Sequence, residues 1–181
     1  MNSRREGPPY RCARLAREGG FTLLEALVVL AIFGILAVVS YPSVKNALEI
    51  RGFENAGRDI LTTLQMAKWQ AVNTKYNHRV RFASDSGGWT YRIEMEKPAG
   101  TWTLKQGQTV KRISTNFGVT LTLPSNSSVI FDPTGFVSGF DSTKNRISLS
   151  SSRLALLGQP NFRTIRFYAS GSTQFIKGTT G

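Results

Sequence analysis

The stretch FTLLEALVVLAIFGILAVVSY, residues 21–41, decides how this chain is organised. It contains a single charged side chain, that of Glu25. An α-helix rises ~1.5 Å per residue, so the stretch would form a helix of roughly 31 Å, about the thickness of the hydrocarbon layer of a bilayer. We therefore expect residues 21–41 to form a transmembrane helix.

The residues that precede this stretch form a basic leader, with five arginines and two glutamates. Basic residues on one side of a membrane segment favour a cytoplasmic location for that side. An ordinary secretory signal has small residues after its apolar stretch, whereas the small pair Gly19-Gly20 comes before it here. A twin-arginine signal at Arg4-Arg5 fits poorly, because the apolar stretch is too distant and too hydrophobic. Cleavage after Gly20 would remove residues 1–20 and keep the membrane helix.

Gly20, Phe21 and Glu25 resemble, in order and spacing, the class III signal of type IV pilins and type II secretion pseudopilins. The resemblance implies that a prepilin peptidase cleaves between Gly20 and Phe21 and then methylates the new amino group of Phe21. It also implies that Glu25 directs the assembly of a helical filament. Pro42 lies where many pilins have a proline that bends the helix.

A charged residue within a membrane helix also needs a physical explanation. A carboxylate there costs about 3 kcal/mol or more, so such residues usually have a partner and a function. Cleavage after Gly20 would create a cation, the α-amino group of Phe21, at nearly the same depth. Residues 21 and 25 lie on one helix face, so this amine is a suitable partner within the chain, and the amine of a neighbouring subunit is equally suitable. The alternative interpretation is a simple anchor with Glu25 at the membrane interface.

Beyond Tyr41 the sequence changes from uniformly apolar to amphipathic. Because Pro42 has no amide hydrogen, we expect it to kink the helix rather than end it. We predict one helix over residues 21–73, roughly 80 Å long, whose second half packs a stripe onto a globular head. Apolar residues recur at steps of three and four along it: Val44, Ala47, Leu48, Phe53, Ala56, Ile60, Leu64, Ala67 and Ala71.

Residues 74–181 are expected to form an antiparallel β head, which makes the fold class α+β. Short segments rich in β-branched and aromatic residues alternate with turn clusters, a pattern typical of an antiparallel sandwich or curled sheet. The predicted strands are 78–83, 89–95, 109–113, 119–123, 128–132, 146–150, 163–168 and 173–177. The turn at 131–135, FDPTG, resembles the Phe-x-Pro-x-Gly turn of the GspH/FimT family of minor pseudopilins and minor pilins. That resemblance implies a type IV pilin-like fold.

The sequence offers little for catalysis or metal binding. His78 is the only histidine, and Cys12, in the leader, is the only cysteine, so the processed chain has no His cluster and no Cys/His pair. We expect Glu94 and Glu96 to be solvated, His78 to be exposed at the start of a strand, and Asp132 to form a turn. No cofactor, no metal and no enzymatic activity are predicted.

The chain is strongly basic, with 23 Lys and Arg against 11 Asp and Glu, a formal net charge of +12. This favours an anionic partner without choosing between nucleic acid, lipid head groups and acidic proteins. Some FimT-type minor pilins bind DNA through a Gly-Arg-x-Arg hairpin near the C-terminus, where this chain has Ser172 and Gln174 instead of the arginines. Candidate nucleic-acid contacts are Arg163, Arg166 and Lys177, and a second candidate patch is Arg79, Arg81, Arg92, Lys111 and Arg112. We favour the alternative that these cations are simply solvated.

Together these features predict a minor pseudopilin or minor pilin, a structural subunit of a type II secretion pseudopilus or a type IV pilus. The expected partners are other pilin or pseudopilin subunits, the prepilin peptidase, inner-membrane lipid and secreted cargo, with DNA as the alternative partner of a FimT-like subunit. The N-terminus is expected in the bacterial cytoplasm and the head in the periplasm.

Overall fold

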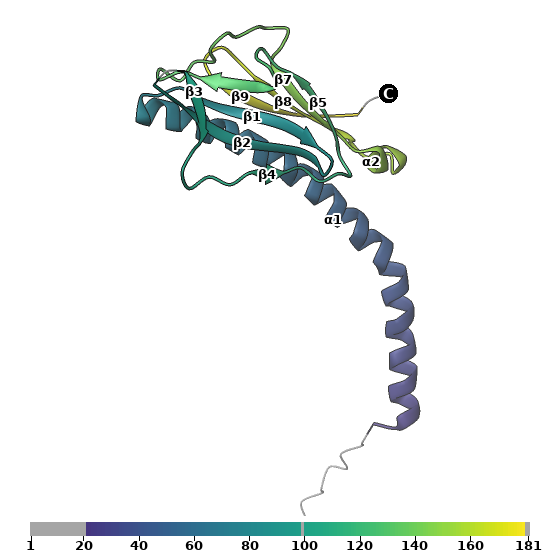
Figure 1. Ribbon diagram of the computed structural model, residues 1–181. Coiled ribbons are helices and arrows are strands. Elements are labelled where there is room, and N and C mark those ends of the chain that lie inside the picture. Colours follow the sequence, from purple (N-terminus) through teal and green to yellow (C-terminus); the bar gives the residue numbers. More distant parts are fainter. Residues whose placement is uncertain (1–20, 99, 180–181) are drawn as a thin grey trace, which may run out of the picture. The chain divides into compact units, whose positions relative to one another are not determined.

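The computed structural model describes residues 21–98 and 100–179, and the predicted leader lies outside them. The chain divides into two units, Met1–Val44 and Lys45–Gly181. One long helix, α1 (Leu23–Thr74), contributes to both (Figure 1). The prediction of a single helix over residues 21–73 is confirmed, with bounds that differ by two residues at the start and one at the end.

Within the second unit, one stripe of α1 is buried. Its members follow steps of four and three along the helix, which keeps them on one face: Phe53, Gly57, Ile60, Leu64, Ala67 and Ala71. The stripe starts later than predicted, since Val44 and Leu48 are exposed. Gly57 is buried and Ala56 only half-buried. The ring of Phe175 packs so close to Gly57 that a Cβ there would lie 2.7 Å from Cε2 of Phe175, so this position requires glycine.

The first sheet has five strands in the order β3-β2-β1-β6, with β4 also paired to β2. Their bounds are β1 (His78–Asp85), β2 (Gly88–Lys97), β3 (Thr101–Leu104), β4 (Lys111–Arg112) and β6 (Ser128–Phe131). Strands β1 and β2 form the predicted hairpin with a tighter turn than expected, because Asp85 pairs with Gly88 and leaves only Ser86 and Gly87 between them. Strand β3 was not predicted.

The second sheet has four antiparallel strands in the order β5-β7-β8-β9. Their bounds are β5 (Gly118–Thr122), β7 (Arg146–Ser150), β8 (Phe162–Phe167) and β9 (Thr173–Gly178). A short helix, α2 (Ser152–Leu156), connects β7 to β8 and was not predicted. Its N-cap is Ser151, whose side chain accepts a hydrogen bond from the N–H of Leu154 at 3.4 Å.

The two sheets and α1 enclose one core (Figure 1). The strands contribute alternate side chains to it, as expected for a strand with one buried face: Val80, Phe82, Tyr91, Ile93, Val129 and Phe131 from the first sheet, and Ile147, Leu149, Ile165 and Phe167 from the second. Burial of each large apolar side chain stabilises the fold by about 1.5–3 kcal/mol. The predicted α+β architecture, a long helix on an antiparallel sandwich, is confirmed.

The Phe131–Gly135 turn is held by one carboxylate, as predicted for Asp132. Its Oδ1 accepts hydrogen bonds from the N–H groups of Thr134 at 2.9 Å and of Phe136 at 3.0 Å. Burial would raise the pKa of this carboxyl, but the hydrogen bonds from Thr134, Phe136 and Gly135 outweigh that effect and hold the pKa below its ordinary value. The charged form of Asp132 therefore stabilises the turn.

A second turn, between β8 and β9, packs against the first one over α1. Gly171 in this turn has φ +68°, and a Cβ there would overlap the carbonyl oxygen of Gly135. The side chain of Lys68, from α1, lies beside both glycines, and its Nζ donates a hydrogen bond to the carbonyl of Ser170 at 2.9 Å. We call Lys68, Gly135, Ser170 and Gly171 the turn junction.

Candidate assembly site

The start of α1 has a side-chain cap. Oγ1 of Thr22 accepts a hydrogen bond from the N–H of Glu25 at 3.2 Å, and the carbonyl of Thr22 accepts one from Ala26 at 3.1 Å. Thr-x-x-Glu is the sequence of a capping box, with Thr at the N-cap and Glu three residues later. Sequence reasoning missed Thr22, although this pattern was its signal. Glu25 thus lies in the first helical turn, where the helix dipole favours a negative charge.

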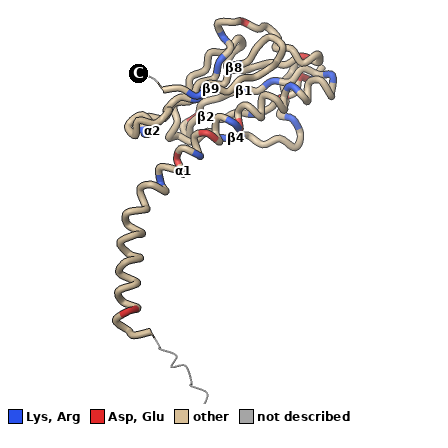
Figure 2. The backbone as a smooth tube through the Cα atoms, turned by 180° about the vertical axis from the view of Figure 1, so that it is seen from behind, with Lys and Arg blue, Asp and Glu red and all other residues tan. Residues whose placement is uncertain are grey.

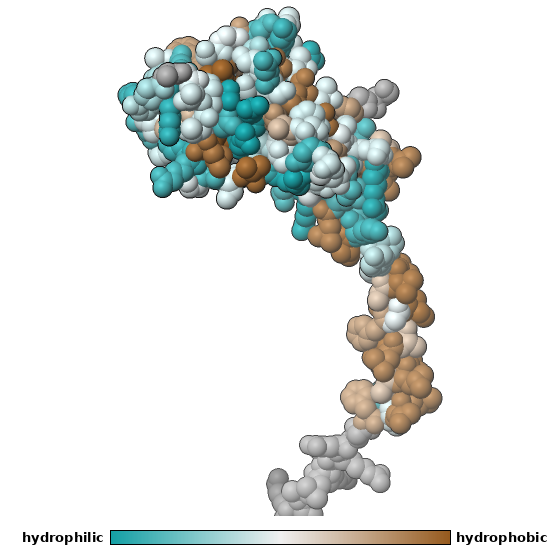
Figure 3. Space-filling view, viewed as in Figure 1, coloured by the Kyte–Doolittle hydropathy of each residue, from teal (hydrophilic) through white to brown (hydrophobic). Residues whose placement is uncertain are grey.

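The apolar side chains that follow are exposed in the described structure. Phe21 is 81% exposed, and the large apolar residues from Leu23 to Val39 are between 41% and 83% exposed. Figure 3 shows this segment as a nearly continuous hydrophobic surface. By length and composition α1 is sufficient to cross a membrane. A continuous apolar surface of this size marks a site that lipid or other helices cover.

Pro42 lies inside α1, which continues for more than thirty residues beyond it. The prediction that this proline does not end the helix is confirmed. Because proline has no N–H, the carbonyl of Val38, four residues earlier, receives no hydrogen bond from it. The expected kink at Pro42 stays a prediction.

The carboxylates of the head are all engaged within the described part of the second unit. Six form ion pairs with Lys or Arg, Glu96 accepts a hydrogen bond from Asn77, and Asp132 holds its turn. The six are Glu49, Glu54, Asp59, Asp85, Glu94 and Asp141. Among residues 21–98 and 100–179, no group of three His, Cys, Asp or Glu side chains is placed to hold a metal ion.

Glu94 is buried rather than solvated, so that expectation was wrong. Only 3% of the residue is exposed, and its carboxylate lies 2.6 Å from Nη2 of Arg79 on one side and 2.6 Å from Nε of Arg92 on the other. Burial would raise the pKa of Glu94, but the hydrogen bonds from Arg92 and Arg79 outweigh burial and lower the pKa. The guanidinium of Arg79 also stacks on Trp102, 4.2 Å from the ring centre. This cluster ties β1, β2 and β3 together.

His78 is also buried, although it was expected on the surface. It is the first residue of β1, and its side chain faces the core with those of Val80 and Phe82 because side chains alternate along a strand. Nδ1 lies 3.0 Å from the carbonyl oxygen of Tyr76, and Nε2 has no hydrogen-bond partner among the described residues. Burial lowers the pKa of His78, partly offset by the Tyr76 carbonyl.

This burial predicts a pH dependence of folding. The unfolded chain takes up a proton on His78 near pH 6.5, whereas the folded head takes it up only at lower pH. The free energy of unfolding should therefore fall as the pH is lowered through 6.5, by at most about 1.4 kcal/mol per pH unit. Urea unfolding of the full chain in detergent at pH 7.5, 6.5 and 5.5 measures this. Gln does not titrate, so His78→Gln should reduce the dependence of the free energy of unfolding on pH in this range. An unchanged pH dependence in this variant would show that His78 is not its cause.

The three candidate nucleic-acid contacts do not form one patch. Side chains alternate along β8, so Arg163 faces the core with Ile165 and Phe167, whereas Arg166 faces the opposite side of the sheet. Arg163 is only 3% exposed. Its Nη1 donates to the carbonyls of Pro160 and Phe162, both at 2.9 Å. Burial contradicts the expectation that Arg163 contacts nucleic acid.

The remaining candidates are divided between sites. Lys177 lies opposite Arg163 in the sheet, and its Nζ is 2.8 Å from Oε1 of Glu54. In the second candidate patch, Lys111 pairs with Asp59 at 2.6 Å and Arg112 pairs with Asp85 at 2.9 Å, while Arg79, Arg81 and Arg92 lie on the outer side of the first sheet. Figure 2 shows Lys and Arg spread over the head strands and α1.

Two protein-family models match the chain. One, described as the prokaryotic N-terminal methylation motif, matches residues 15–41. The other, described as type II transport protein GspH, matches residues 56–171, well over half of the chain. The chain belongs to the GspH family. The first match includes Phe21 and Glu25, and also Gly20, which lies outside the described residues.

Solved structures resemble this GspH-family chain. The minor pseudopilin EpsH from the type 2 secretion system of Vibrio cholerae is 10% identical, with a TM-score of 0.52 over 69% of this chain and 96% of EpsH. The type IV minor pilin FimU of Pseudomonas aeruginosa is 13% identical, with a TM-score of 0.48 over 68% of this chain and 91% of FimU. No curated protein sequence matches the chain. The predicted family and the pilin-like fold are confirmed, and family membership implies assembly with other pilin-class subunits.

Proposed function

We propose that this GspH-family chain is a non-catalytic subunit of a pseudopilus or pilus, which assembles through the N-terminal half of α1 in protein secretion or pilus biogenesis. The observation that carries the proposal is the exposed apolar surface of residues 21–41, whose only charge is Glu25 in the capped first turn. Such a surface is suited to contact lipid before assembly and to pack against the helices of neighbouring subunits after it.

The leader and Glu25 have distinct roles in this proposal. The five leader arginines keep the N-terminus in the cytoplasm, so the head lies on the periplasmic side of the inner membrane. The prepilin peptidase cleaves after Gly20 and methylates Phe21. The new amine of one subunit then neutralises Glu25 of a neighbour inside the lipid layer, which sets the stagger between the two helices.

The head supports protein contacts better than DNA uptake. Arg163 is buried and Lys177 is paired with Glu54, and the positions of the arginine hairpin hold Ser172 and Gln174. No observation therefore favours a FimT-like DNA-binding role as a second function. In a secretion system, the exposed head is the part that would meet cargo.

Mass spectrometry of the protein purified from its own membranes tests the processing step. The native chain is expected to begin at N-methylated Phe21. Gly20→Ala should leave nearly all of the protein as uncleaved precursor, because the resemblance to the class III signal places the cleavage directly after this glycine. Gly19→Ala is the matched control and should be processed normally. A native chain that begins at Met1 would overturn the proposal.

A further inference from the structure

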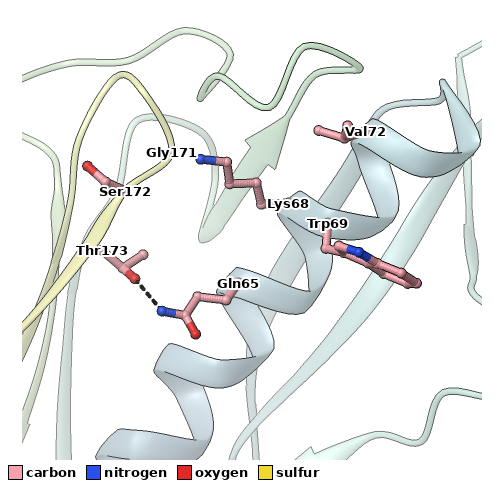
Figure 4. Close-up of a pocket in the computed structure, with 7 residues that line it drawn as sticks. All are labelled: Gln65, Lys68, Trp69, Val72, Gly171, Ser172 and Thr173. Carbon is pink, nitrogen blue, oxygen red and sulfur yellow. Dashed lines mark hydrogen bonds between the residues drawn. The ribbon is translucent and has the colours of Figure 1, made fainter.

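Near its C-terminal end, α1 lines a groove with the β8–β9 turn. The groove is lined by Gln65, Lys68, Trp69 and Val72 of α1 and by Gly171, Ser172 and Thr173 of the turn. Gln65 and Lys68 point toward the turn, whereas the ring of Trp69 extends from the helix away from it and forms the outer edge of the space (Figure 4). Its volume is about 500 Å³, enough for one or two large side chains. We call this space the α1 groove. It lies entirely within the second unit, beside the turn junction that fixes the β8–β9 turn on the helix.

The α1 groove combines apolar walls with uncharged polar groups and one cation. Trp69 is 65% exposed, which is unusual for so large a side chain. Nε2 of Gln65 donates a hydrogen bond to Oγ1 of Thr173 at 3.2 Å across the groove. The ammonium of Lys68 is bonded to the carbonyl of Ser170 and has no carboxylate partner among the described residues. The groove therefore suits an apolar side chain with a negative charge close by.

The chain has more cations just past the end of the helix. A neighbouring hollow of about 330 Å³ is lined by Lys75, Tyr76 and Lys97, among others. Neither lysine has a carboxylate partner in the described structure, and Tyr76 is 50% exposed. Glu96, the acidic residue of this hollow, is held by the side-chain amide of Asn77 at 2.6 Å. Lys68, Lys75 and Lys97 thus border a surface with two exposed aromatic rings and no unengaged acid among the residues described.

A second copy of this chain is a poor occupant for that surface. Residues 45–181 contain 18 Lys and Arg but only 8 Asp and Glu, and all eight carboxylates are engaged as described above. Two heads would therefore repel each other. Among its described residues, neither head has an unengaged carboxylate that could pair with the lysines of the other. Nucleic acid fits this surface less well, because its affinity comes chiefly from many cations on successive phosphates, and only Lys68, Lys75 and Lys97 border the two hollows.

We propose that the α1 groove binds an acidic loop on the head of a different subunit of the same filament. An apolar side chain of that loop packs beside Trp69, and its carboxylates pair with Lys68 and Lys75. Tryptophan is enriched among the residues that dominate the energy of protein interfaces. This inference rests on the proposed filament function and adds the partner's chemistry: acidic, and not a copy of this chain.

Photo-crosslinking in cells that make the filament tests the inference. The full chain carries benzoylphenylalanine in place of Trp69, and the cross-linked peptides are identified by mass spectrometry. The expected product is a peptide with Asp or Glu from the head of another pilin-class subunit. The same probe at Leu156, which is 88% exposed on α2, is the control and should not give that product. Cross-links only to a second copy or to DNA, or no cross-link, would overturn the inference.

A charge reversal tests the electrostatic part. Lys75→Glu should reduce the cross-link about tenfold, the effect of losing about 1.4 kcal/mol of binding free energy. Arg146→Glu, a charge reversal at an exposed position of β7, should not reduce it. Replacing the cross-linked Asp or Glu of the partner by Lys, in the same cells as the Lys75→Glu variant, should restore the cross-link. The N-terminus and filament content are measured in the same samples. If the chain begins at Phe21 and enters filaments without the cross-link, only the groove inference fails; an unprocessed chain refutes the proposed function.

Discussion

Gly171→Ala is expected to destabilise the head by roughly 2–5 kcal/mol. The backbone of Gly171 has φ +68°, a conformation that costs an L-residue about 1–2 kcal/mol. An alanine Cβ would also overlap the carbonyl oxygen of Gly135. Backbone atoms cannot rotate away as a side chain can, so the two turns would have to separate, and overpacking of this kind costs about 1–3 kcal/mol.

Gly139→Ala separates these two effects. Gly139 has a similar φ of +64°, but nothing lies within 4 Å of the position that an alanine methyl group would occupy there. The free energy of unfolding of the Gly139→Ala variant should therefore fall only by the cost of the left-handed backbone conformation, about 1–2 kcal/mol. Urea unfolding of the full chain in detergent, followed by tryptophan fluorescence, measures both variants. Equal losses for the two variants would contradict the close packing of the turn junction.

Glu25→Gln is expected to reduce incorporation into filaments about tenfold or more, while the chain remains in the membrane. The substitution keeps a side chain that can serve in a capping box but removes the negative charge that, in the proposed assembly, pairs with the Phe21 amine of a neighbour. Loss of a pairing worth about 1.4 kcal/mol is sufficient for a tenfold effect. The amount of the chain in sheared, pelleted filaments, relative to the amount in membranes, measures the result.

Thr22→Ala is the matched control for this prediction. It removes the side chain that caps the N–H of Glu25 and leaves the charge in place, so helix α1 should lose about 0.5–2 kcal/mol but incorporation should stay close to that of the native chain. If Thr22→Ala fails to assemble and Glu25→Gln assembles normally, Glu25 acts through the helix cap and not through its charge.

The elements with strong local patterns could be predicted from the sequence. The long helix follows from its apolar run and its three- and four-residue steps, and the Phe131–Gly135 turn follows from the way Asp132 bonds amides two and four residues ahead. By contrast, β3 is only four residues long and α2 only five. Segments this short contain too few residues to show the period of a strand or a helix, so their sequences cannot be told from that of a loop.

The main error of the sequence-based predictions was to place buried polar residues on the surface. Part of this error was avoidable. His78 and Arg163 each begin a run of alternating apolar residues, with Val80 and Phe82 in one strand and Ile165 and Phe167 in the other. Period-two counting would have placed both side chains inside. Glu94 was different, because its burial depends on Arg79 in the neighbouring strand. Only the register of β1 against β2 brings these two residues together.

The last strand has a consequence for the order in which the protein forms. Strand β9 closes the core against α1, through the contact of Phe175 with Gly57 and the ion pair of Lys177 with Glu54. These contacts join segments more than a hundred residues apart, and long-range closure of this kind slows folding. During synthesis the part of the α1 stripe around Gly57 thus stays uncovered until almost the whole head has been made. A prematurely terminated chain lacks this closure, so part of its core stays open to proteases.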